Sequence, residues 1–331
     1  MRRTTMNTCT HRLAAICGAL MLGAAGLASA ATAGYPARPI RLLVPFAPGG
    51  GSDTLARILA SKMSESMGQT WVIDNRGGAG GNLAAETVAR AEPDGHTIFI
   101  ALSTVITVNP SLYKLPYSVE RDLQPVVHIA SAQYIVVLNP SVPAKTLAEL
   151  VTLAKQKPGA LNYASGGIGT PLHLAAELMK KRAGINLTHV PYKGGAQAAA
   201  SVLAGETQVL FGSVASSLAH AKAGRLRAIA TTGPKRAKVA PELPTIAESG
   251  YPGFDVSTWY ALLVPAKTPK DIAARIHDET LKALQHSDVQ TAMARQGLEI
   301  ESGPASMVAA RIKSETAMWA TVIKEAGIRA Q

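Results

Sequence analysis

A strand, a glycine-rich turn and the start of a helix follow one another at 40–53, and this stretch constrains the fold most strongly. Apolar residues at 40–44 predict a buried strand, and the segment 45–53 reads PFAPGGGSD. Consecutive glycines can adopt backbone conformations closed to other residues and let a ligand approach the main chain. Ser52 or Asp53 can cap the following helix, whose first amides favour an anion. The alternative interpretation is an ordinary turn between a strand and a helix.

The same alternation continues along the chain and predicts two α/β units with parallel strands. The expected strands of the first unit are 40–46, 71–75 and 96–102, and its expected helices are 52–67 and 83–90. The second unit has expected helices at 146–157, 171–183, 196–204 and 216–223, and expected strands at 161–165, 187–192, 208–211 and 226–231. Further strands are expected at 126–130, 134–138 and 255–264, and the last helices at 269–286, 288–295 and 305–326.

The first unit has few helices of its own, so the last helices of the chain are expected to pack on it. We therefore predict a discontinuous first domain, 35–132 plus 256–331, and an inserted second domain, 133–255. Two such lobes joined by strand crossings form a cleft that can close by hinge motion.

Residues 1–30 have the pattern of a secretory signal peptide. Three arginines precede an uncharged apolar run at 13–27, and Ala-Ser-Ala ends at Ala30. The pattern predicts cleavage near Ala30 and export to the periplasm. An N-terminal membrane anchor is the alternative.

Cysteine content and charge restrict the chemistry. Cys9 and Cys17 both lie in the expected leader, so the mature chain would have no disulfide, no thiolate catalysis and no cysteine metal site. The leader holds three of the 33 basic residues and none of the 22 acidic ones, so its removal lowers the formal charge from +11 to +8. This charge is compatible with an anionic solute. Aromatic residues make up only 5% of the chain, which argues against a nucleic-acid surface.

Motifs of common exported enzymes are missing from the sequence. There is no G-x-S-x-G, no H-E-x-x-H and no Gly-Lys-Ser/Thr, and the run GAGGNL at 78–83 is an incomplete dinucleotide fingerprint. We expect no catalytic residues, no cofactor and no metal, and we interpret the run at 77–82 as a structural turn. The alternative is an exported α/β enzyme for a small anionic substrate, with a site assembled only in three dimensions.

A second glycine-rich loop occurs in the second unit, where 163–173 reads YASGGIGTPLH. A strand again ends in glycines and hydroxyls, and Pro171 suits the first turn of a helix. Ligands of open α/β sheets bind at the carboxyl ends of the strands. Two such loops, one on each lobe, could hold one anion from both sides.

Short motifs with a specific order cover the chain from about residue 35 to its end: VPFAPGGGSD (44–53), NRGGAGGN (75–82), PDGHT (93–97), SGGIGT (165–170), VPYKG (190–194), LRAIA (226–230) and LPTIAE (243–248). In these motifs the chain resembles the receptors of tripartite tricarboxylate transporters, also called the Bug family. The resemblance implies a two-lobed, type II-like periplasmic binding protein for a small mono-, di- or tricarboxylate or an aromatic acid. It also implies a monomer whose partner is the membrane permease, or a sensor kinase if the protein is an orphan.

In this family, the loops corresponding to 48–53 and 166–170 hold a ligand carboxylate through main-chain amides, hydroxyls and bound waters. The resemblance and the positions at strand ends together give these candidate ligand contacts: Phe46, Gly50, Gly51, Ser52, Asp53, Ser103, Thr104, Ser165, Gly166, Gly169, Thr170, His173, Tyr192 and Ser213. Asp53 could instead cap its helix, and His173 and Tyr192 could instead have packing roles. Gln208 stands where many members have Asp, so the resemblance does not identify the solute.

Overall fold

The computed structural model describes residues 34–49, 51–192 and 194–329. Most of the predicted helices and strands form in these residues, with small shifts at their ends. The expected leader, 1–30, and Gly50 lie outside the described residues. Among the described residues, no helix is both long and apolar enough to cross a membrane.

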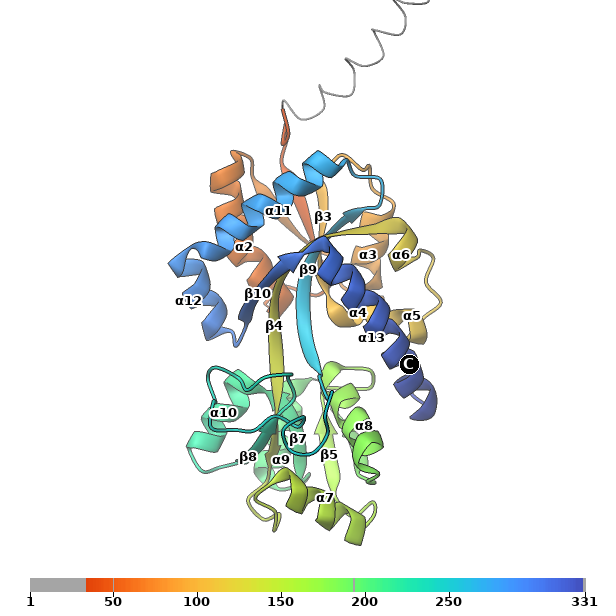
Figure 1. Cartoon of the computed structure of the whole chain (residues 1–331), viewed down its shortest axis with the longest axis vertical. Helices are drawn as coiled ribbons and strands as arrows, with labels where there is room; N and C mark the ends of the chain where they lie inside the picture. Colours follow the sequence, from red (N-terminus) through yellow and green to blue (C-terminus); the bar gives the residue numbers. More distant parts are fainter. Residues whose placement is uncertain (1–33, 50, 193, 330–331) are drawn as a thin grey trace, which may run out of the picture.

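The first lobe, at the top of Figure 1, contains three parallel strands: β1 (Ile40–Val44), β2 (Trp71–Asn75) and β3 (Thr97–Leu102). The crossing strand β9 (Ser257–Pro265) pairs antiparallel with β3 in the same sheet. The helices that cover it are α2 (Gly51–Met67), α3 (Asn82–Ala89), α11 (Lys270–Gln285), α12 (Ser287–Arg295) and α13 (Ala305–Glu325). Ile40 and Leu42 of β1 pack with α2, α11 and α12, whereas Leu43 faces α3 and the start of α13. Because helices cover both faces of the sheet, the strand β1, which lies between β2 and β3, is apolar almost throughout.

The second lobe repeats this design with its own strands and helices: β5 (Asn162–Ser165), β6 (Thr188–Pro191), β7 (Val209–Ser213), β8 (Arg227–Thr231), α7 (Leu147–Gln156), α8 (Pro171–Ala183), α9 (Gly195–Ala204) and α10 (Val214–Lys222). One hydrophobic cluster lies between the sheet and α7 and α8, and another lies under α9 and α10. The carboxyl ends of β1 and β5 each lead into a glycine-rich loop and then a helix.

Two strands run between the lobes, as Figure 1 shows: β4 (Leu123–Leu138) and β9 (Ser257–Pro265). The first part of β4 pairs antiparallel with β9 and with β10 (Glu299–Pro304), and its last part pairs with β7 and β8. The strand order is β2-β1-β3-β9-β4-β7-β5-β6, with β8 and β10 also on β4.

The prediction of two separate strands at 126–130 and 134–138 was wrong, because β4 is continuous. Polar residues at 131 and 133 interrupt the apolar run, but Ser131 keeps its pairing with Trp259 and donates its hydroxyl hydrogen bond to Glu301 at 2.6 Å. The strand β10 was not predicted, because its residues EIESGP are mostly polar and partly exposed.

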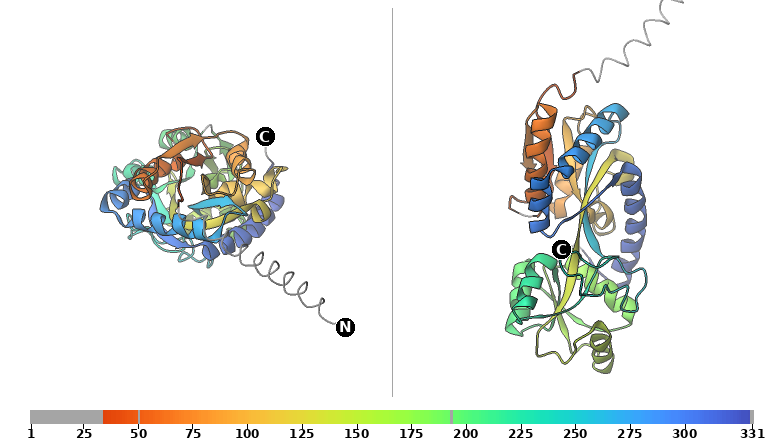
Figure 2. Two further views of the ribbon diagram at one scale, coloured as in Figure 1. Left: turned by 90° about the horizontal axis from the view of Figure 1, so that it is seen from above. Right: turned by 60° about the vertical axis from the view of Figure 1, so that its left-hand side comes forward.

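The helix α13 contacts both lobes. Its first half packs in the first lobe through Val308 and Ile312, whereas Trp319 and Ile323 belong to the hydrophobic cluster of the second lobe. An ion pair between Lys181 of α8 and Glu325 adds to this contact. The view on the right of Figure 2 shows α13 descending from the upper lobe toward the lower one. The division of the chain into 35–132 plus 256–331 and 133–255 stays a prediction.

The contact of α13 with the second lobe can be tested at Ile323, which is 5% exposed. Ile323→Ala is expected to lower the free energy of unfolding by about 2–5 kcal/mol, since it removes buried methyl groups and leaves a cavity. The control Thr321→Ala changes an exposed residue of the same helix and should stay within about 0.5 kcal/mol of the parent. Urea unfolding measures both. Equal losses for the two variants would contradict the packing of this helix.

Candidate ligand-binding site

The loop between β1 and α2 is organised by the carboxylate of Asp53, which is 3% exposed. One oxygen accepts hydrogen bonds from the Gly49 amide and from Arg57 Nε, both at 2.9 Å, and the other accepts from Asn75 Nδ2 at 3.1 Å. Asn75 Nδ2 also donates to the Phe46 carbonyl at 2.9 Å. Arg57, with the Gly49 amide and Asn75, holds the pKa of Asp53 below its ordinary value, although burial opposes this shift. Asp53 therefore holds the loop together as an ionised, internally paired group.

A tyrosine from the crossing strand β9 lies against the same loop. A Cβ atom at Gly51 would be 3.1 Å from the Tyr260 hydroxyl, and Ser52 forms a hydrogen bond with this hydroxyl. Burial raises the pKa of Tyr260 to about 12, so the phenol is neutral at pH 7. A side chain at 51 would therefore need the Tyr260 hydroxyl to shift by a few tenths of an ångström. Tyr260 is a candidate site residue that the sequence did not reveal.

The second glycine run, 77–81, lies behind the first loop. A Cβ atom at Gly81 would be 2.9 Å from Pro45 Cβ and from Val105 Cγ2, and Gly81 has φ +93°. Asn109 Nδ2 donates to the Gly80 carbonyl at 3.0 Å. These contacts fit the structural turn that the sequence predicted for this run.

The loop of the second lobe, 166–170, is closed by bonds within itself and by contact with α9. The Thr170 hydroxyl donates to the Gly167 carbonyl at 2.7 Å. A Cβ atom at Gly166 would be 3.0 Å from the Gly195 amide nitrogen, so the loop lies directly on the first turn of α9. A Cβ atom at Gly169 would be 3.1 Å from Leu112 Cδ1 of α5 (Asn109–Leu112), which belongs to the first lobe. The two lobes therefore meet at this loop.

Two histidines lie next to this loop. His173, 5% exposed, accepts a hydrogen bond at Nδ1 from the Gly169 amide, at 3.0 Å. His189 of β6 lies with Nε2 2.7 Å from Ser165 Oγ, and its ring stacks on His173 with centroids 4.1 Å apart. His173 was predicted as a ligand contact with packing as the alternative, and its Nδ1 atom is engaged by the loop. His189 was not predicted, because a lone histidine on a short strand carries no motif.

The distance between Ser165 and His189 matches that of a nucleophile and its general base. Ser165 is, however, completely buried, and its hydroxyl oxygen also accepts the Gly167 amide at 3.2 Å. A serine nucleophile needs access to a substrate carbonyl. This pair therefore supports the loop and presents no attacking oxygen.

The remaining predicted contacts lie at strand ends or on the loops. Ser103 starts the short helix α4 (Ser103–Thr107) and accepts the Trp259 amide at 3.3 Å, and the next residue, Thr104, is half-buried. Phe46 and Tyr192 pack partly against the hydrophobic clusters of their own lobes. The exposed Ser213 precedes α10 and pairs with Tyr134 of β4.

Gln208, the departure from the family pattern, lies at the opposite end of β5. Its Oε1 atom accepts the Asn162 amide at 3.0 Å, and its Nε2 atom donates to the Gly205 carbonyl at 3.4 Å. Asn162 starts β5, whereas Ser165 ends it next to the loop. The side chain at 208 therefore supports the start of the strand.

Comparison with known proteins identifies the family. The sequence model described as "Tripartite tricarboxylate transporter family receptor" matches residues 55–328. The chain belongs to this receptor family.

One relative and two solved structures match this receptor over nearly their full lengths. The Bordetella pertussis protein BugT is 35% identical over 321 residues, which cover 96% of this chain and 98% of BugT. An R. palustris protein solved with adipate is 33% identical with a TM-score of 0.75, covering 89% of this chain and 99% of its own. MatC from Rhodopseudomonas palustris, solved with bound malate, is 30% identical with a TM-score of 0.72, covering 87% and 100%. The two-lobed α/β fold of periplasmic solute-binding proteins is thereby confirmed, and receptors of this family are periplasmic binding proteins.

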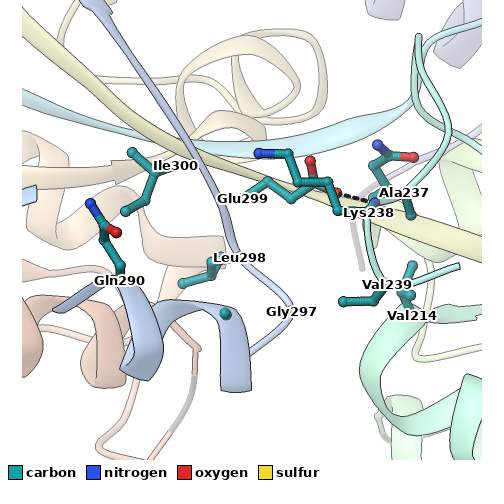
Figure 3. A pocket seen from close by; sticks show the side chains of 11 residues that line it. Val214, Ala237, Lys238, Val239, Gln290, Gly297, Leu298, Glu299 and Ile300 are labelled. Atoms are coloured by element: carbon teal, nitrogen blue, oxygen red, sulfur yellow. Dashed lines mark hydrogen bonds between the residues drawn. The ribbon is translucent and has the colours of Figure 1, made fainter. Parts of the chain in front are cut away.

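A cavity of about 340 Å³ lies where the lobes of the receptor meet beside the crossing strands (Figure 3). Val214 and Val239 line it from the second lobe, and Leu298 and Ile300 line it from the first. The main-chain amide of Lys238 donates to Glu299 Oε1 across the junction at 3.1 Å. The described residues that line this cavity include none of the predicted contacts, although Val214 directly follows Ser213.

The role of Asp53 predicts a specific pH dependence of stability. Asp53→Asn should lower the free energy of unfolding at pH 7, because the internal pairing needs the charged form. A carboxylate whose pKa is lowered on folding contributes stability above its unfolded pKa, about 3.9, and loses it as pH falls through the folded value. The difference between parent and variant should therefore shrink below about pH 4. Urea unfolding from pH 7 to 3 measures it, with the exposed Glu92→Gln as control. A difference that does not vary with pH would contradict this role.

The hydrogen bond between the Lys238 amide and Glu299, which joins the two lobes, predicts an effect on the equilibrium between closed and open forms. Glu299→Ala should shift the solute-free receptor toward open forms, because the Lys238 amide loses its acceptor. One such bond contributes about 0.5–1.5 kcal/mol, a change of a few-fold in the equilibrium. Lys238→Ala is the matched control, since it keeps the main-chain donor. Small-angle X-ray scattering measures both, and the same shift in both variants would show that the side chain of Lys238 carries the effect.

Proposed function

We propose that this receptor binds a small carboxylate between its lobes and delivers it to the membrane permease of a tripartite tricarboxylate transporter. The observation that carries the proposal is that two receptors of the same family, each matched over nearly its full length, were solved with adipate and with malate. Both are aliphatic dicarboxylates, so we expect a ligand of this class first.

The arrangement of the two loops supports this proposal. Each loop follows the carboxyl end of a parallel strand and precedes a helix, where unpaired amides and the helix dipole favour an anion. The residues proposed to contact the ligand are those named from the sequence, among them Ser52, Gly166 and Thr170. His173 is the exception, because its Nδ1 atom accepts the Gly169 amide of the loop. Tyr260 is added to them because its hydroxyl lies against Gly51 and Ser52.

Binding without turnover fits the ionisable groups near these loops. The carboxylate of Asp53 is paired with Arg57, and Ser165 is buried beside His189, so neither presents a free acid, base or nucleophile. We therefore propose a receptor that returns its ligand unchanged. We also propose that it acts as a monomer in the periplasm after a leader is removed near Ala30, and that its lobes, 35–132 plus 256–331 and 133–255, close on the ligand.

A test of this function compares two neighbouring glycines. The parent should show higher thermal stability and a measurable heat of binding with adipate, malate or another small carboxylate, and no response to neutral sugars. A Cβ atom at 166 would be 3.0 Å from the backbone of α9, whereas one at 195 would make an ordinary contact of 3.6 Å with Leu172. Gly166→Ala should therefore weaken binding about tenfold or more, about 1.4 kcal/mol, and Gly195→Ala should change it little.

Calorimetry with purified, ligand-stripped protein measures these affinities. Equal affinities in both variants would show that the loop 166–170 does not hold the ligand. Turnover of the carboxylate during the titration would favour an enzyme instead.

A further inference from the structure

The two histidines behind the second glycine loop form a stacked pair with defined contacts. Their rings are 12° from parallel, with centroids 4.1 Å apart, and Tyr163 stacks on His189 at 4.8 Å. His173 is buried and His189 is half-buried. Neither ring belongs to the SGGIGT motif of the loop, 165–170.

Each ring contacts one end of the loop. His173 Nδ1 accepts the Gly169 amide at 3.0 Å, while His189 Nε2 lies 2.7 Å from Ser165 Oγ, which accepts the Gly167 amide at 3.2 Å. The amides of Gly167 and Gly169 are therefore both used inside the loop. The amide of Ile168, between them, has no hydrogen-bond partner within the described part of the chain. A loop fixed in this way leaves that amide to a ligand.

We propose that His173 and His189 are positioning residues, neutral imidazoles that hold 166–170 in the form whose remaining amides bind the carboxylate. This inference rests on the proposed function. It assigns His173 no direct contact with the solute.

The surroundings of the pair favour the neutral form. Burial, followed by the neighbouring His189, lowers the pKa of His173 to about 4, and burial also lowers the pKa of His189. Glu177 opposes the shift of His173, but its carboxylate is occupied by Lys180 at 2.7 Å and by the Tyr163 hydroxyl at 2.5 Å.

Arg329, from the end of the described chain, lies near the two histidines. It lines the same cavity of about 520 Å³ as they do, together with Glu177 and Lys180. The positive charge of Lys180 disfavours an imidazolium here. At pH 7, His173 Nδ1 is therefore an acceptor.

Protonation of His173 would turn this acceptor into a donor that faces the Gly169 amide. Two donors cannot share a hydrogen bond, so the loop would lose its support. Affinity for an anion should then fall as pH approaches about 4. Simple charge attraction predicts the opposite, since a new positive charge near the site would strengthen anion binding. Measured against a variant that lacks the imidazole, the sign of the pH effect thus separates a positioning role from an electrostatic one.

A crossed pair of substitutions tests the proposal. Asn places its amide oxygen near the position of Nδ1, and Gln places its amide near the position of Nε2. At 173, where Nδ1 makes the contact, His173→Asn should bind adipate within about threefold of the parent, and His173→Gln should bind at least tenfold more weakly. At 189, where Nε2 makes the contact, the ranking should reverse, with His189→Gln close to the parent and His189→Asn weak. A role in packing alone predicts the same ranking at both positions, and that result would overturn the proposal.

Two further readouts support this test. The first corrects for the protonation of adipate, and the second needs no ligand. When adipate affinity is measured from pH 7 to 4, His173→Asn has no imidazole at 173, so its loss of affinity reflects the protonation of adipate. The parent should lose affinity more steeply than this variant. In the ligand-free protein, hydrogen exchange at the Gly169 amide should be slow in the parent and in His173→Asn, and fast in His173→Gln. If no carboxylate binds the parent, the proposed function fails while exchange still tests the support of the loop. Equal exchange in all three proteins would overturn that support.

Discussion

The structure depends on one strand that belongs to the sheets of both lobes. Along its 16 residues, β4 pairs first with β9 and β10 and then with β7 and β8. Main-chain hydrogen bonds in a buried sheet are costly to leave unmade, so the lobes cannot separate by breaking this ladder. Relative motion must come from twisting of β4 and β9. The register shifts of this pair near 125–130 are places where such a strand bends more easily.

A charged network connects this crossing to the last helix. Arg311 of α13 bonds to Glu315 at 3.0 Å, lies 3.7 Å from Glu301 of β10, and sits 5.1 Å from the ring of Trp259 on β9. Burial raises the pKa of Glu315, and the nearby Arg311 opposes that shift. The same helix then reaches the hydrophobic cluster of the second lobe at Trp319. Any closing motion must therefore carry α13 with it or change its contact with α8.

Local pattern was enough to predict most elements, because their residues carry the signal themselves. The strand 71–75 and the helix 171–183 were predicted with the bounds they have, the helix being marked by Pro171 at its start and Gly184 just after its end. Contacts between segments far apart in the sequence were harder to predict. The continuity of β4 depends on a partner for Ser131 that lies 170 residues away, and β10 forms only because β4 offers it an edge.

In the candidate site, too, features within one segment could be predicted, whereas contacts between distant segments could not. The glycine loops were visible in the sequence, since a strand, glycines and a helix start follow one another. Tyr260 reaches Gly51 only through the pairing of β9 with β3, and His189 reaches Ser165 only through the pairing of β6 with β5. A strand residue with no motif gives no sequence signal for such a contact. The pairing register of the strands, not a sequence motif, brings these residues together.

Both loops solve one electrostatic problem in similar ways. A site for an anion must fix flexible glycines without placing an unpaired negative charge beside the ligand. In the first loop, the carboxylate of Asp53 binds an amide of the loop and is neutralised by Arg57. In the second, an imidazole with a low pKa accepts an amide without carrying any charge. In the proposed site both side chains are occupied by the loops. Discrimination among carboxylates would then come from groups around the rest of the ligand, and for this reason motifs shared across a family do not identify the solute.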